Sequence, residues 1–161
     1  MGMKLKALLY SDGSERSFSA ALYAAGLMRT FPGMELTLIS FIDVPRGPLG
    51  LTRDEEEASA KVLSEVTREI VQETKKIFDE RHMRIGAVVG RPEASTVAAT
   101  ITKFAGDGNY NLIIMGTKGP TDLRALVAGS LAHAVLHAAH CPVLLVKKLP
   151  AEILESLGEQ P

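Results

Sequence analysis

The sequence predicts an α/β fold: a single domain with an open five-stranded parallel sheet in the order 3-2-1-4-5 and helices on both faces. Short apolar runs alternate with amphipathic stretches along the chain, which is the element order of parallel sheets. The apolar runs show no polar/apolar alternation, as expected for strands buried on both faces. The length of 161 residues also fits one domain. We expect that domain over residues 1–149 and a C-terminal tail over residues 150–161.

The first elements are a strand, a turn, a helix and a second strand. The apolar run at residues 6–10 predicts a buried strand that ends at the turn residues 11–14. Ser14 is a suitable N-cap for a helix that runs to about Arg29. A second buried strand is expected over residues 36–42.

The middle of the chain predicts a loop and a long helix. Residues 43–53 contain two prolines and two glycines, which favours a loop long enough to act as a flap. The acidic run 54–57 suits the positive end of a helix, and apolar residues spaced by four and seven carry that helix to about His82. The remaining elements are a strand over 83–89, a helix over 93–105, a strand over 111–115, a helix over 130–139 and a strand over 143–146.

Composition and charge narrow the class of function. The formal net charge is -1, so the chain has no overall field that would attract nucleic acid or an anionic membrane. No apolar stretch approaches the roughly 20 residues that a membrane span needs. The single cysteine, Cys141, precludes an intrachain disulfide. We therefore expect a soluble cytoplasmic protein that binds neither nucleic acid nor membrane.

The most informative motif lies between the fourth strand and the fourth helix. Gly116, Gly119 and Gly129 lack a Cβ, so the backbone can approach a ligand closely. Gly129 and Ser130 open the helix, where free N–H groups form a site for an anion. The spacing matches neither the Walker loop nor the dinucleotide fingerprint. Glycines alone are equally compatible with turns and a helix cap, so the motif by itself leaves both interpretations open.

The position of this motif in the predicted sheet favours a ligand site. In the order 3-2-1-4-5 the strand order reverses between strands 1 and 4, and open α/β sheets bind ligands beyond the carboxyl ends of the strands at such a point. The turn at residues 11–13 and the loop at residues 116–119 would meet there. We expect Asp12 to accept hydrogen bonds from ribose hydroxyls or a base, although its carboxylate is also suited to capping the first helix.

These residues resemble the universal stress protein family over about residues 4–148. The nucleotide-binding branch of that family shows the pattern G-x2-G-x9-G-S/T, which Gly116, Gly119, Gly129 and Ser130 satisfy. The likeness also includes Leu9 to Ser14, Phe41 to Asp43, Val89 to Pro92, Ile113 to Gly116 and Cys141 to Val146. It implies an adenine nucleotide alpha hydrolase-like fold. It also implies a nucleotide-dependent regulatory or stress-response protein that binds ATP, or AMP or ADP, with Mg²⁺ or Mn²⁺ as the accompanying ion.

The resemblance also implies roles for individual residues. Asp12 would face the adenosine, Tyr10 and Ser11 would line the pocket for the base, and the backbone of Phe41 would hydrogen-bond the adenine edge. Met115 would pack on the adenosine, with Gly116 and Thr117 beside the ribose and the α-phosphate. Gly119, Gly129, Ser130, Leu131 and Ala132 would hold the polyphosphate. Some ATP-binding members have a hydroxyl residue in place of Ala132, so one hydrogen bond to phosphate is lost here.

Other side chains near these loops allow two interpretations. Lys118 and Arg124 can neutralise phosphate charge or lie on a solvated surface. His133, His137 and His140 share one predicted helix face, which would suit a metal. Alanines surround them, however, and no carboxylate is near in sequence, so we expect no metal site. No motif supplies a catalytic nucleophile or base.

Three functions therefore remain open. The first is a regulatory protein whose nucleotide-bound state is read by a protein partner. The second is a slow ATPase or nucleotide hydrolase that uses a divalent ion, and the third is a dimeric interaction module without nucleotide. Members of the resembled family commonly dimerise through their last strands, and the apolar edge strand Val143–Val146 suits a homodimer of that kind.

Overall fold

The computed structural model describes residues 4–41, 52–90, 96–117 and 130–158. Within these ranges one parallel sheet contains the five predicted strands in the order β3-β2-β1-β4-β5. The strands are β1 (Lys6–Tyr10), β2 (Glu35–Ser40), β3 (Gly86–Val89), β4 (Leu112–Gly116) and β5 (Val143–Val146). The predicted fold class and strand order are confirmed.

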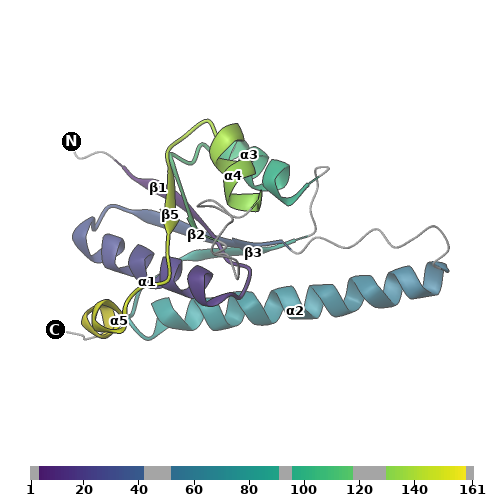
Figure 1. Cartoon of the computed structure of the whole chain (residues 1–161), viewed down its shortest axis with the longest axis horizontal. Coiled ribbons are helices and arrows are strands. Elements are labelled where there is room, and N and C mark those ends of the chain that lie inside the picture. Colours follow the sequence, from purple (N-terminus) through teal and green to yellow (C-terminus); the bar gives the residue numbers. More distant parts are fainter. Residues whose placement is uncertain (1–3, 42–51, 91–95, 118–129, 159–161) are drawn as a thin grey trace, which may run out of the picture.

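Helices cover both faces of the sheet, as Figure 1 shows. One face carries α1 (Glu15–Thr30), α2 (Arg53–Asp79) and α5 (Ala151–Gly158), and the other carries α3 (Val97–Asp107) and α4 (Ser130–Ala138). Alternate side chains of β1 supply both layers of core. Ala7 and Leu9 pack on the side of α1 and α2, whereas Leu8 and Tyr10 pack on the side of α3 and α4.

Helix starts follow the capping signals of the sequence. The side chain of Ser14 accepts a hydrogen bond from the Ser17 amide and caps α1, as predicted. Thr52 and Glu55 form a reciprocal capping box at the start of α2, which places that start one residue ahead of the acidic run. Helix α2 has 27 residues and extends beyond the edge of the sheet (Figure 1).

The third strand is shorter than predicted, because the first residues of the expected strand belong to the turn that ends α2. The Met83 amide donates to the Phe78 carbonyl at 2.9 Å, and His82 adopts a left-handed φ of 55°. These contacts close the helix terminus, so β3 begins only at Gly86. All four residues of β3 are exposed at the edge of the sheet.

A short helix occupies the segment that the sequence predicts as a tail. Helix α5 packs against α1: a Cβ on Gly26 would lie 3.0 Å from the Leu157 Cδ2 atom. The Arg81 guanidinium donates to the Leu157 carbonyl at 3.4 Å, which ties α5 also to the end of α2. None of the helices in the described ranges is both long and apolar enough to cross a membrane.

Candidate functional site

The carboxyl ends of β1 and β4 lie side by side at the point where the strand order reverses. Tyr10 is in register with Met115, so the residues at and beyond the ends of the two strands lie next to each other, where the predicted crevice would form. Those residues are Ser11 to Gly13 on one side and Gly116 and Thr117 on the other. This is the position at which an open α/β sheet offers backbone groups to a ligand.

The turn after β1 exposes a carboxylate in a fixed backbone conformation. Asp12 is exposed, and its Oδ1 accepts a hydrogen bond from the Ser14 amide at 2.9 Å. Gly13 has a φ of +80°, which side chains with a Cβ rarely adopt. Ser14, and not Asp12, is the N-cap of α1. The Asp12 carboxylate instead stabilises the turn immediately before this N-cap.

Tyr10 and Ser11 direct their side chains to opposite faces of the sheet. The Tyr10 hydroxyl donates to the Phe41 carbonyl at 3.1 Å on the α3 side. The Ser11 hydroxyl is buried on the other side, where it contacts Ser17 at 3.1 Å and Thr74 at 3.0 Å. A ligand in the crevice would therefore meet Ser11 through its backbone.

Packing against α1 requires a glycine at position 116. A Cβ at this position would lie 2.6 Å from the backbone carbonyl carbon of Arg16, in the first turn of α1. The sequence predicts that this glycine allows close approach of a ligand, and the structure adds the close approach of α1. Thr117 is buried, and its amide donates to the Val146 carbonyl at 2.9 Å.

The second half of the glycine motif is only partly described. Lys118, Gly119, Arg124 and Gly129 lie outside the described residues, as do residues 43–51 of the flap predicted over residues 43–53. The last two residues of that predicted flap instead begin α2, with Thr52 as its N-cap. Ser130 is the first residue of α4. Ala132 is buried, and Leu131 packs against the same core cluster on the α3 side. Both would reach a phosphate through the backbone amides of the first turn of α4.

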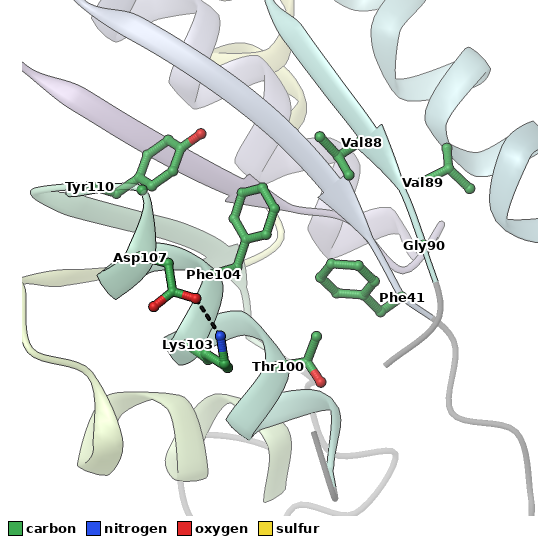
Figure 2. Close-up of a pocket in the computed structure, with 10 residues that line it drawn as sticks. Phe41, Val88, Val89, Gly90, Thr100, Lys103, Phe104, Asp107 and Tyr110 are labelled. Carbon is green, nitrogen blue, oxygen red and sulfur yellow. Dashed lines mark hydrogen bonds and ion pairs between the residues drawn. The ribbon is translucent and has the colours of Figure 1, made fainter. Parts of the chain in front are cut away.

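A cavity of about 460 Å³ lies beside this crevice, between α3 and the exposed edge strand β3. Figure 2 shows the aromatic rings of Phe41, Phe104 and Tyr110 on one side of it and Val88 on the other. The Phe41 and Phe104 rings meet edge to face with centroids 6.4 Å apart, and Phe104 stacks on Tyr110 at 5.9 Å. The cavity and the predicted site residues have only Phe41 in common, among the described residues.

The sequence gives no signal for this cavity. Phe104 lies on the apolar face of a helix and Tyr110 precedes a buried strand, so both have the pattern of ordinary core residues. Only the tertiary arrangement brings these rings together beside β3.

His133 and His137 lie on α4, and His140 follows its end. Within the described residues, no three His, Cys, Asp or Glu side chains gather closely enough to hold a metal ion. His133 and His137 are exposed, and a ring nitrogen of His140 lies 3.1 Å from the Tyr110 carbonyl oxygen. Partial burial raises the pKa of the Cys141 thiol, which lowers the fraction of reactive thiolate.

The fold defines a class: open parallel α/β proteins, which bind ligands beyond the carboxyl ends of the strands where the strand order reverses. The chain belongs to the universal stress protein family, whose family model matches residues 5–147. It is 34% identical to universal stress protein MJ0531 of Methanocaldococcus jannaschii over 146 residues, which are 89% of this chain and 82% of that protein.

Solved structures of related proteins have the same fold. The structure of MJ0577 of M. jannaschii is 26% identical, covers 93% of this chain and 100% of its own, and superposes with a TM-score of 0.67. A universal stress protein in complex with cAMP is 15% identical, covers 90% of this chain and 98% of its own, and has a TM-score of 0.64. The protein from Archaeoglobus fulgidus in complex with dAMP is 21% identical, covers 90% of this chain and 100% of its own, and has a TM-score of 0.54.

Proposed function

We propose that this protein binds an adenine nucleotide in the crevice between β1 and β4 and acts as a nucleotide-dependent regulatory or stress-response protein. The observation that carries the proposal is that the carboxyl ends of β1 and β4 lie side by side, with Tyr10 in register with Met115, where the strand order reverses. The cAMP and dAMP complexes of proteins with this fold support an adenosine monophosphate unit as the recognised group.

In this proposal the described part of the crevice recognises the adenosine. The exposed carboxylate of Asp12 accepts hydrogen bonds from the ribose hydroxyls, and the backbone of Phe41 binds the edge of the base. Tyr10 supports that backbone, because its hydroxyl already holds the Phe41 carbonyl. Met115 lies under the adenosine, with Gly116 and Thr117 beside the ribose and the first phosphate.

The remaining phosphates are assigned to the start of α4 and the loop before it. The pattern G-x2-G-x9-G-S at Gly116, Gly119, Gly129 and Ser130 supports membership of the nucleotide-binding branch. Backbone amides at the helix start favour an anion, and Lys118 and Arg124 add positive charge. We propose ATP with Mg²⁺ or Mn²⁺ as the full ligand, and AMP or ADP as ligands of the same site.

Three further proposals concern the protein as a whole. Residues 1–149 form the nucleotide-binding domain and residues 150–161 a C-terminal appendage. Two copies associate through β5, which lies at an edge of the sheet and whose first three residues are only partly buried. The protein acts in the cytoplasm.

Calorimetric titration with adenosine, AMP and ATP tests the proposed function. We expect saturable binding of all three, at one site per chain, and product analysis after incubation with ATP and Mg²⁺ separates a binding protein from a hydrolase. The absence of heat from all three ligands at millimolar concentration would contradict the proposal and favour an interaction module without nucleotide.

A further inference from the structure

A chain of buried hydroxyl groups connects the Asp12 turn to α2. Ser11 follows β1, Ser17 lies in the first turn of α1, and Thr74 lies on α2, close to its C-terminal end. All three are almost completely buried, with exposed fractions of 0%, 2% and 0%. The Ser11 Oγ atom is central, at 3.1 Å from the Ser17 Oγ and 3.0 Å from the Thr74 Oγ1.

Each hydroxyl in this chain has a backbone contact as well. The Ser17 hydroxyl donates to the Ser14 carbonyl at 2.8 Å, and the Thr74 hydroxyl donates to the Ile70 carbonyl at 2.7 Å. The Ser11 Oγ accepts from the Gly13 amide at 3.4 Å. Burying polar groups costs free energy unless they are hydrogen-bonded, and this set is mutually satisfied.

Counting protons shows which member is indispensable to the connection. The single proton of Ser17 points to the Ser14 carbonyl, and the proton of Ser11 then points to Ser17. The proton of Thr74 points to the Ile70 carbonyl at 2.7 Å, so the contact between Ser11 and Thr74 needs a shared proton, which either hydroxyl can supply. In both arrangements the Thr74 hydroxyl is the group through which α2 holds Ser11.

The same stretch of α2 also touches the turn directly. A Cβ on Gly13 would lie 2.9 Å from the Ile70 Cγ1 atom, so the turn rests on α2 with no room for a side chain. Gly13 is already in the left-handed region, and Asp12 closes the turn by accepting from the Ser14 amide at 2.9 Å. Ile70 and Thr74 of α2 thus contact the two neighbours of Asp12, Gly13 and Ser11, and so fix the position of its carboxylate.

We propose that Thr74 is a positioning residue for the nucleotide site, because its hydroxyl fixes the turn that presents Asp12 to the ligand. The inference rests on the proposed function and adds a regulatory route to it. A partner or a bending motion that shifts α2 changes nucleotide affinity through Thr74, although α2 itself contributes no group to the crevice between β1 and β4 in the described residues.

Thr74→Val tests the proposal, with two matched variants as controls. Valine keeps the shape of threonine and removes the hydroxyl, and Thr74→Ser restores the hydroxyl. Thr67→Val makes the same change at another buried threonine of α2, whose hydroxyl donates to the Leu63 carbonyl within the helix at 2.7 Å. The loss of one hydrogen bond to the turn should weaken AMP binding about fivefold in Thr74→Val, and by less than about twofold in Thr67→Val and Thr74→Ser.

A second readout separates this inference from the proposed function. Hydrogen exchange of the Ser14 amide reports the turn itself, and we expect exchange about tenfold faster in Thr74→Val than in Thr67→Val. If the unaltered protein binds no AMP, the proposed function fails and the exchange rates alone decide whether Thr74 holds the turn. Equal exchange rates in the two valine variants, or unchanged AMP affinity in a folded Thr74→Val protein, would overturn the inference.

Discussion

At the scale of single residues, two glycines show how packing and ligand approach demand the same residue type. Gly13 combines a φ of +80° with contact to Ile70, and Gly116 lies against the backbone of Arg16. The glycine spacing in the sequence marks Gly116 as a place of close approach, whereas Gly13 is predicted only as part of the turn at residues 11–14. The spacing does not distinguish a neighbouring helix from a ligand, because both exclude the same atom.

Gly116→Ala should destabilise the protein by about 1–3 kcal/mol, because the new Cβ would overlap the first turn of α1 and force β4 and α1 apart. Urea denaturation followed by circular dichroism measures the change in the free energy of unfolding. Gly33→Ala is the control, since a Cβ there meets nothing within 4 Å and should leave the stability within about 0.5 kcal/mol. Equal stabilities of the two variants would contradict the packing role of Gly116.

Asp12→Ala should weaken adenosine, AMP and ATP binding alike, by about tenfold, because a hydrogen bond from the ligand to a charged carboxylate is lost. Asp12→Asn keeps an oxygen that can accept from the Ser14 amide while removing the charge, and thus separates the turn from the carboxylate. Calorimetry gives the three affinities for each variant. A loss confined to ATP would show that Asp12 acts on the phosphates and not on the adenosine.

At the scale of elements, the sequence was most informative where local signals decide the structure. The bounds of β1 and β5 agree with the predicted ones, and Ser14 caps α1 as expected, because apolar runs and caps are local features. The sequence does not predict the late start of β3 at Gly86 or the helix in the predicted tail. Both depend on tertiary contacts, namely Met83 with Phe78 and Leu157 with Gly26. No local signal in the sequence separates these outcomes.

The capping box of α2 predicts a pH-dependent helix start. The amide and hydroxyl of Thr52 donate to the Glu55 carboxylate, and these bonds lower the pKa of Glu55. A carboxyl whose pKa is lowered by folding stabilises the folded state above its unfolded pKa, and that contribution is lost as the pH falls through the folded pKa. We therefore expect the first turn of α2 to fray selectively in acid.

Glu55→Ala should make amides at the start of α2 exchange faster near neutral pH, and the difference from the unaltered protein should vanish as the pH falls through the lowered pKa of Glu55. Hydrogen exchange resolved by residue provides the measurement. Glu56→Ala changes an acidic residue in the same first turn outside the capping box, and should have a smaller effect. An equal effect of the two variants at neutral pH would assign the stabilisation to charge alone.

At the scale of the whole molecule, one sheet organises two different surfaces. The alternation of apolar and amphipathic stretches predicts a parallel sheet, and the order 3-2-1-4-5 is a separate hypothesis that the sheet confirms. The predicted crevice at the β1–β4 junction depends on that order. The aromatic cavity beside β3 arises because residues 41, 104 and 110 converge from three separate elements, and no pattern in the sequence reports that convergence. The sheet also ends in two unlike edges, with β3 exposed throughout and β5 partly buried.

The two edges give a test of the proposed homodimer. If β5 pairs with β5 of a second copy, sedimentation should give the mass of a dimer and the amides of β5 should be protected from exchange, while amides at the outer edge of β3 exchange freely. A monomeric protein, or selective protection of β3, would contradict association through β5.

The central claim is that the turns after β1 and β4 form an adenine-nucleotide site, and a titration of the labelled protein with AMP, followed through its backbone amide resonances, tests it most directly. We predict saturable shifts centred on Asp12 to Ser14, Phe41, Gly116 and Thr117, which are lost in a folded Gly129→Val variant because a branched side chain would block the phosphate loop. Shifts centred instead on Val88 and Phe104, or the absence of shifts at millimolar AMP, would contradict the claim.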